Sequence, residues 1–180
     1  MRNRRSKKGT SDAAARNLTP EERRLKTFQR AVKLLAAKPR SIAELRERLS
    51  ESRFANKSTV EEVIKRLKEY GYLDDERFAF SYASLKVKQR PIGRRRLERD
   101  LSLKKIDGAV AGEALDLVFA ETSEEELIDQ AIEKRVRLRG RPQDRAEAKS
   151  LFDHLLRQGF PFELVSEKVR AAWHSAPEEE

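Results

Sequence analysis

Residues 19–39 read TPEERRLKTFQRAVKLLAAKP, and this stretch decides the fold class of the chain. Thr19 precedes a proline, and Glu22 follows three residues later. This combination is a capping box with proline at the first helical position, which typically begins a helix. Pro39 cannot continue a helix, so the helix should end before it. Apolar residues recur at spacings of three and four, the period of a helix with one buried face. The residues expected on that face are Leu25, Phe28, Val32 and Leu35.

The same signals recur along the rest of the chain. Ser41 and Glu44 form a second capping box, and Ser123 and Glu126 form a third. Glycine suits the left-handed position that often follows a helix, as at Gly71. No stretch alternates apolar and polar residues convincingly, so we expect little or no β-sheet. The chain is therefore predicted to be all-α.

The predicted helices recur in groups of three. Leu49, Leu101 and Leu155 lie in the middle helix of each group, at intervals of 52 and 54 residues. A nearly constant interval is typical of an array in which each unit buries its open face on a neighbour. The similarity between the groups is weak, however, and nine helices can also form one globule. We favour tandem three-helix repeats over residues 19–74, 75–121 and 122–174, with a disordered basic arm over 1–18 and an acidic tail over 175–180.

The composition narrows the classes of partner and site. The 180 residues include 40 Lys and Arg against 31 Asp and Glu, for a formal charge of +9. Such an excess favours a polyanion, either nucleic acid or an anionic membrane surface, although it can serve solubility alone. The chain has no cysteine, which excludes disulfides, thiolate metal sites and a catalytic thiol. No apolar run reaches the ~20 residues that cross a bilayer, and the N-terminus lacks the apolar stretch of a secretory signal, so we expect a cytoplasmic protein without a membrane partner.

The sequence offers no visible arrangement for catalysis. None of its seven glycines belongs to a loop that could hold phosphates ahead of a lysine. His154 and His174 lie twenty residues apart, and we interpret each as a helix-surface residue rather than a ligand or general base. Carboxylates mostly lie one turn from a basic residue, as Glu61 does from Lys65, which is typical of a solvated helix face. We expect a protein that is not an enzyme and has no catalytic residue, metal or cofactor.

Positive charge gathers in two clusters. Between Lys86 and Lys105, nine basic residues stand against two acidic ones. In the predicted helix here, Arg95 and Arg99 are one turn apart on the side away from Leu97. Arg96 faces an aspartate at i+4, and Arg94 lies closer to the apolar stripe, where its stem can cover the edge of the core. The candidate binding residues of this first basic cluster are Arg94, Arg95, Arg96, Arg99, Lys104 and Lys105.

The second basic cluster lies about one repeat further along the chain. Its candidate binding residues are Arg135, Arg137, Arg139 and Arg141. Any single arginine is more simply explained as part of an exposed helix. Two clusters together can follow a phosphate backbone or meet an acidic groove of a protein, and we favour this binding role.

Residues 71–79 read GYLDDERFA and resemble the joint motif of the RecX family of bacterial regulatory proteins. The Gly-Arg-Arg-Arg-Leu run at 93–97 and the later Asp100-Leu101 and Lys104-Lys105-Ile106 are also similar to the family pattern. Lys105 stands where the family usually has a glycine. The resemblance covers roughly residues 24–173. The motif residues are Gly71, Tyr72, Leu73, Asp74, Asp75, Arg77 and Phe78.

The resemblance implies both a fold and a function. RecX-like proteins are all-helical, elongated arrays of three tandem three-helix repeats that resemble winged-helix units. They bind the RecA recombinase filament and contact single- and double-stranded DNA without sequence specificity. They inhibit the recombinase, ATPase and co-protease activities of RecA, and thereby modulate DNA repair and the SOS response. The resemblance further implies a cytoplasmic protein without a cofactor, and we expect a monomer.

The motif can also be interpreted from its residues alone. Gly71 ends one repeat, Asp74 or Asp75 caps the next helix, and Tyr72 and Phe78 can close the seam between repeats together with the leucine at 73. We therefore interpret it as structural first and as a contact site second. Phe78 is expected to be buried against Tyr72 or the preceding helix.

Two alternative functions remain open at this stage. Three-helix units with a basic helix also suit a helix-turn-helix DNA-binding transcriptional regulator. Such regulators generally dimerise, and no sustained heptad that would support a dimer is visible here. A scaffold that binds protein and ignores DNA is the other alternative.

Overall fold

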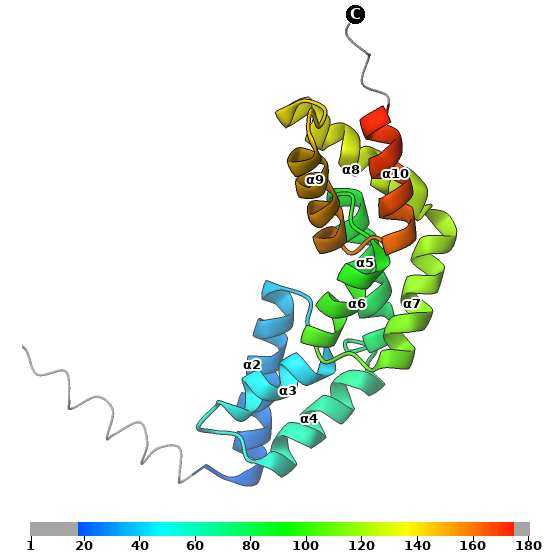
Figure 1. Cartoon of the computed structure of the whole chain (residues 1–180). Coiled ribbons are helices and arrows are strands. Elements are labelled where there is room, and N and C mark those ends of the chain that lie inside the picture. The colour runs from blue at the N-terminus through cyan, green and yellow to red at the C-terminus, as the bar shows by residue number, and fades with distance from the viewer. Residues whose placement is uncertain (1–17, 175–180) are drawn as a thin grey trace, which may run out of the picture. The chain divides into compact units, whose positions relative to one another are not determined.

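The structure is a computed structural model that describes residues 18–174. All regular elements in this range are α-helices, which confirms the predicted all-α class (Figure 1). The basic arm, apart from Leu18, and the acidic tail lie outside the described residues. The helices are α2 (Pro20–Ala37), α3 (Ile42–Ser50), α4 (Lys57–Glu69), α5 (Asp75–Gln89), α6 (Arg94–Leu103), α7 (Gly108–Glu121), α8 (Glu124–Arg139), α9 (Arg145–Gln158) and α10 (Phe162–His174).

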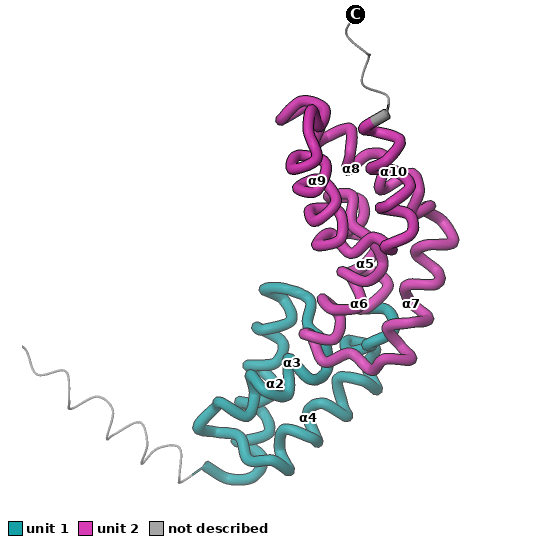
Figure 2. The backbone as a smooth tube through the Cα atoms, in the orientation of Figure 1, with its two compact units in different colours: residues 1–78 teal, residues 79–180 magenta. Residues whose placement is uncertain are grey.

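The chain divides into two compact units, residues 1–78 and 79–180, which Figure 2 shows in different colours. We call them unit 1 and unit 2; the division falls within α5. In unit 1, α2, α3 and α4 pack on one another. In unit 2, α6 packs on α7, while α8, α9 and α10 pack on one another and α9 also contacts α6. This grouping is consistent with a tandem helical array, and the repeat bounds drawn from the sequence stay predictions.

The first two capping boxes form as the sequence predicts. The backbone N–H of Glu22 donates to Thr19 Oγ1 at 3.2 Å, and the N–H of Thr19 donates back to the Glu22 carboxylate at 2.8 Å. Ser41 and Glu44 make the same exchange at 3.1 and 3.3 Å. The third predicted capping box, Ser123 with Glu126, was wrong. Ser123 Oγ instead accepts a hydrogen bond from the backbone N–H of Glu125 at 3.1 Å.

The buried face of α2 differs from the predicted one. Leu25 and Val32 are 58% and 44% exposed, whereas Thr27 and Ala31 are buried. Small side chains at these two positions let α2 approach its neighbours closely. The Thr27 hydroxyl donates to the carbonyl of Arg23 at 2.8 Å, so its burial leaves no unsatisfied polar group. The apolar spacing therefore identified the helix and half of its inner face, because Phe28 and Leu35 pack against the core of unit 1 while Leu25 and Val32 do not.

The end of α9 meets the beginning of α6 within unit 2. Helix ends leave N–H donors and carbonyl acceptors without partners inside the helix. Here each end satisfies the other: Gly93 N–H donates to the carbonyl of Gln158 at 3.0 Å, and Arg95 N–H donates to that of Gly159 at 3.2 Å. A Cβ at Gly93 would collide with the Gly159 carbonyl, and one at Gly159, whose φ is 92°, would collide with Arg96. Two glycines thus allow the contact, which we call the glycine seam.

Candidate functional site

The joint motif begins with the turn that ends α4. Gly71 has a φ of 69°, and its N–H donates to the carbonyl of Lys68 at 2.9 Å. The N–H of Tyr72 donates to Leu67 at 2.9 Å, and Leu73 is buried in the core of unit 1. Glycine is favoured at this position because its backbone is left-handed.

The acidic pair of the motif supports two helices at once. Asp74 accepts from the backbone N–H of Arg77 at 2.9 Å and so caps α5, while the Arg77 guanidinium donates to the Gly71 carbonyl. Asp75 accepts from the N–H of Ile42 at 2.9 Å, in the first turn of α3. Burial raises the pKa of Asp75, although the hydrogen bond from Ile42 favours its charged form. These contacts support the interpretation of the motif as structural.

The aromatic residues of the motif are less buried than the sequence predicts. Tyr72 is 65% exposed and meets Tyr70 edge-on, with ring centroids 6.4 Å apart. Phe78 is half-buried rather than fully buried. Leu73 occupies the core instead, and the residue before it turns toward solvent. Phe78 is therefore less buried than predicted, and its packing against the preceding helix, the other predicted partner beside Tyr72, stays a prediction.

Two arginines of the first basic cluster, Arg94 and Arg96, make contacts within the chain. Arg94 pairs with Asp116 at 2.7 Å and with Glu98 at 3.1 Å, which joins α6 to α7. Burial lowers the pKa of Arg94, but these two carboxylates outweigh it and the net shift is upward. Arg96 donates to the carbonyl of Arg157 at 3.2 Å in the glycine seam. Both side chains thus contribute to holding unit 2 together.

Arg95 and Arg99 are placed differently. Both are exposed, while Leu97 between them is fully buried, as the sequence predicts. Within residues 18–174 neither guanidinium has an ion pair or a hydrogen bond. They are one helical turn apart and can bind an outside anion without breaking an internal contact.

The lysines of this cluster lie at the end of α6. The Lys104 ammonium lies 5.0 Å from the centre of the Tyr82 ring, a cation–π distance. Lys105 has a φ of 59°, so a lysine adopts the left-handed conformation for which glycine is best suited. Its N–H donates to Ser102 at 2.8 Å, and the following residue, Ile106, is buried.

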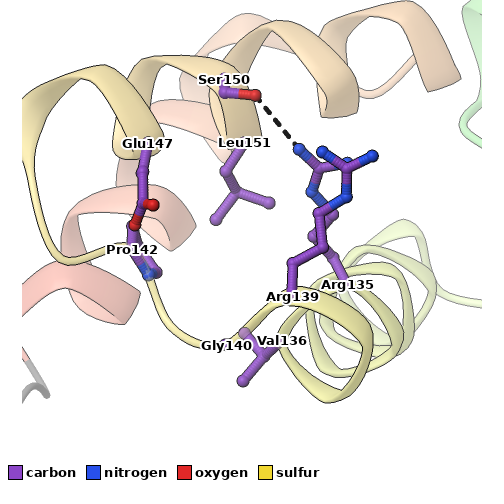
Figure 3. Close-up of a pocket in the computed structure, with 8 residues that line it drawn as sticks. All are labelled: Arg135, Val136, Arg139, Gly140, Pro142, Glu147, Ser150 and Leu151. Atoms are coloured by element: carbon purple, nitrogen blue, oxygen red, sulfur yellow. Dashed lines mark hydrogen bonds between the residues drawn. The ribbon is translucent and has the colours of Figure 1, made fainter.

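The second basic cluster is only partly brought together. Arg135 and Arg139 line a pocket between α8 and α9, and Figure 3 shows their guanidinium groups side by side. Arg135 Nη2 donates to Ser150 Oγ at 3.1 Å. Arg137 and Arg141 are exposed and do not line this pocket.

Two further basic residues, which the sequence did not assign to the second basic cluster, lie near Arg135 and Arg139 without lining the pocket. His154 is half-buried on α9, and the nearby charges of Arg135, Arg157 and Arg139 act on it. Burial first, and then these three charges, lower the pKa of His154. The spacing of Ser150, His154 and Arg157 by four and three residues places them on one face of α9, a signal that was present in the sequence.

Metal centres and membrane spans are not found over residues 18–174. No group of three or more histidines and carboxylates in this range could hold a metal ion. None of the helices described is long and apolar enough to span a bilayer.

Comparison with known proteins identifies the family. A family model for the second three-helix domain of RecX matches residues 74–115. The regulatory protein RecX of Chlorobium limicola is 30% identical over 150 residues, which cover 82% of this chain and 90% of that protein. The chain belongs to the RecX family.

Other RecX proteins support this assignment. RecX of Bacillus licheniformis is 32% identical over 141 residues, or 78% of this chain and 53% of that protein, so the chain spans about half the length of this relative. A crystal structure of RecX from Lactobacillus salivarius superposes with a TM-score of 0.73 over 84% of this chain and 97% of that one. At 21% identity, that likeness shows the shared fold. The family and the all-helical fold inferred from the joint motif are thus confirmed.

The match to the RecX domain model has a defined extent in this chain. It begins at Asp74, within the joint motif, and includes all of α6 with the first basic cluster. The second basic cluster lies beyond it. The pocket between α8 and α9 therefore lies outside the part of the chain that the RecX domain model matches.

Proposed function

We propose that this RecX family member binds RecA and the DNA of its filament, and inhibits the recombinase, ATPase and co-protease activities of RecA. In this way it would modulate DNA repair and the SOS response. The observation that carries the proposal is that Arg95 and Arg99 are exposed and, among residues 18–174, unpaired, beside neighbours that are engaged internally. Membership of a family of regulatory proteins also supports the proposal, because a regulatory protein is expected to act by binding its target rather than by catalysing a reaction.

The chemistry of these two arginines supports both kinds of partner. A guanidinium donates two parallel hydrogen bonds to a phosphate or a carboxylate, so one ridge can contact DNA and acidic side chains of RecA. Phosphate contacts carry no sequence information, and we propose nonspecific binding to single- and double-stranded DNA. Lys104, Lys105 and the second basic cluster, Arg135, Arg137, Arg139 and Arg141, complete the proposed interface.

The proposal includes the organisation and setting of the protein. We place the three repeats at residues 19–74, 75–121 and 122–174. The protein would act as a monomer in the cytoplasm, without a cofactor and without catalysis of its own.

ATP hydrolysis by RecA on single-stranded DNA tests the proposal. The wild-type chain should slow hydrolysis, and Arg95→Ala with Arg99→Ala should weaken both inhibition and DNA affinity. The salt dependence of DNA binding should fall by about one unit of slope for each phosphate that the variant no longer neutralises. The matched control is Arg30→Ala with Lys33→Ala on α2, which removes two exposed charges about one turn apart and should leave inhibition unchanged. Absence of inhibition at every ratio, with circular dichroism confirming a folded chain, would refute the proposal.

The glycine seam argues against the main alternative, a transcriptional regulator that uses α6 to read bases. Recognition helices contact base edges mainly through their N-terminal residues. In this chain the backbone at the start of α6 is hydrogen-bonded to the end of α9 and Gly93 is buried, so this end of the helix cannot enter a groove as deeply as a free helix end. A regulator would show altered preference among duplex sequences when Arg95 and Arg99 are replaced, whereas we expect a uniform loss of affinity.

A further inference from the structure

Three arginines and a histidine gather where α8 faces α9. Arg135 and Arg139 lie one turn apart on α8, at one end of the pocket in Figure 3. His154 and Arg157 belong to α9, and the charges of all three arginines act on the His154 imidazole. Ser150, one turn before His154, accepts a hydrogen bond from Arg135 at 3.1 Å. Four basic side chains therefore converge on a short stretch of the surface of unit 2.

The described part of the chain does not neutralise this cluster. Burial first, and then the charges of Arg139 and Arg157, lower the pKa of Arg135, and no carboxylate within residues 18–174 acts in the opposite direction. Other cations of unit 2 do have a carboxylate partner: the pairs are Arg94–Asp116, Lys149–Asp153 and Lys168–Asp129. Like charges held together are unfavourable, and an anion from outside would relieve the repulsion.

Glu147 also lines the pocket but serves a different contact. Its carboxylate accepts from the backbone N–H of Gln143 at 2.8 Å, in the loop that follows α8. Figure 3 shows it beside Pro142, at the other end of the pocket from the two guanidinium groups. The end formed by Arg135 and Arg139 therefore remains a site for an added anion.

We propose that the pocket between α8 and α9 binds a phosphate of a nucleic-acid strand, with Arg135 and Arg139 donating to its oxygens. The Ser150 hydroxyl completes the site, while His154 lies one turn further along α9 and Arg157 contacts the neighbouring phosphate. The inference rests on the proposed function, because it assigns part of the DNA contact to these residues.

A phosphate strand suits the cluster better than an acidic protein segment does. Guanidinium groups from α8 and a hydroxyl from α9 converge here from different directions. The tetrahedral oxygens of a phosphate can accept from several directions at once, whereas the two oxygens of a carboxylate lie in one plane. Successive phosphates of one strand can then engage Arg139 and Arg157 together.

His154 makes the occupancy of the site measurable. In the free protein burial, followed by Arg135, Arg157 and Arg139, disfavours the protonated imidazole. A phosphate beside it opposes those three charges and favours protonation. Binding should therefore raise the pKa of His154 and be accompanied by uptake of a proton.

The other helices packed on α9 do not compete for this effect. From α6, Arg96 lies 3.8 Å from the carboxylate of Asp100. From α10, Lys168 pairs with Asp129 of α8 at 2.6 Å. Among the described residues, none of these four charged groups shifts the pKa of His154.

Imidazole NMR of the full chain tests the site directly. The pH titration of His154 is followed at low ionic strength in buffer alone, with an oligothymidylate and with polyglutamate, and His154→Gln identifies its signal. The oligothymidylate should raise the pKa of His154 by about one pH unit. Polyglutamate should raise it less. An equal or larger rise with polyglutamate would overturn the assignment to nucleic acid and favour an acidic protein partner.

Two variants with the same change in charge separate the pocket from the rest of the surface. Arg135→Ala with Arg139→Ala should raise the pKa of His154 in the free protein, because two like charges are gone, and should abolish the response to oligothymidylate. Lys134→Ala with Arg170→Ala removes two exposed charges of unit 2 that lie outside both the pocket and the proposed interface, and should preserve the response.

The outcome is independent of RecA. A His154 pKa that oligothymidylate leaves unchanged would overturn the phosphate site, even if Arg95 and Arg99 still prove necessary for inhibition. A response that survives in Arg135→Ala/Arg139→Ala would equally overturn it. Failure of the wild-type chain to inhibit RecA, by contrast, would refute the proposed function and leave the NMR response as expected.

Discussion

Gly93→Ala probes the glycine seam between α6 and α9. The new methyl group would collide with the carbonyl of Gly159, so the two helix ends must separate. Overpacking of this kind costs about 1–3 kcal/mol. Weakening the hydrogen bonds from Gly93 and Arg95 to the end of α9 adds about 0.5–1.5 kcal/mol for each bond. Alanine also lowers the conformational entropy of the unfolded chain relative to glycine, which offsets about 0.4–1 kcal/mol of this loss in stability. The free energy of unfolding of unit 2 should therefore fall by about 1–6 kcal/mol.

The stability of unit 2 can be measured by tryptophan fluorescence, and a second glycine provides a matched control. Trp173, the single tryptophan, lies in α10, so its fluorescence during urea unfolding follows unit 2. Circular dichroism follows both units. Gly112→Ala is the matched control, because nothing lies within 4 Å of a Cβ at this position in α7. That change should stabilise unit 2 by up to about 1 kcal/mol, since alanine is the better helix former.

The two variants must move the Trp173 transition in opposite directions. A Gly93→Ala chain that unfolds within about 0.5 kcal/mol of the wild type, the range of ordinary surface substitutions, would show that the seam tolerates a side chain. The close packing of the two helix ends would then contribute little to the free energy of unfolding of unit 2.

Three more predictions concern single residues. Lys105→Gly should stabilise unit 2 by about 1 kcal/mol because it removes a side chain from a left-handed backbone, and a lower melting temperature would contradict this. Phe78→Ala should destabilise by about 1–2 kcal/mol, less than the 3–5 typical of a fully buried phenylalanine; urea unfolding followed by circular dichroism measures it, and a loss above that range would indicate full burial. The pKa of His154 is lower in the folded than in the unfolded chain, so the unfolded state binds the proton more tightly and stability should fall as pH drops through about 6.5. His154→Gln should remove that part of the pH dependence of urea unfolding, and an unchanged dependence would contradict the assignment.

Local chemistry explains what could be predicted about the fold. Capping boxes depend on residues three apart in sequence, so Thr19 and Ser41 identified helix starts without knowledge of their surroundings. The buried face of α2 depends on what packs against it. Phe28 and Leu35 pack on the core as the apolar period predicts, whereas the burial of Thr27 and Ala31 depends on the neighbouring helices and could not be predicted from the period.

In the candidate site, too, local sequence predicted some features, while others depend on how the helices pack. The outward direction of Arg95 and Arg99 follows from the helical period around Leu97, and the structure confirms it. The engagement of Arg94 depends on Asp116, which only the packing of α6 on α7 brings within reach. The spacing of His154 and Arg157 places them on one face of α9, but their nearness to Arg135 and Arg139 depends on the packing of α9 on α8 and was not visible from the sequence.

The glycine seam also limits how the protein can be dissected. The domain match covers residues 74–115, which suggests a fragment that could be expressed by itself. Such a fragment would lack α9, and the N–H groups of Gly93 and Arg95 would be left without the carbonyls that accept from them. It would also lack the Glu124 carboxylate, which accepts from the N–H of Arg94 at 2.7 Å. Three donors at the start of α6 would need water instead, so the first turn of that helix should fray in the fragment. Binding measured on the isolated piece would then describe Arg95 on a different backbone from the one it has in the full chain.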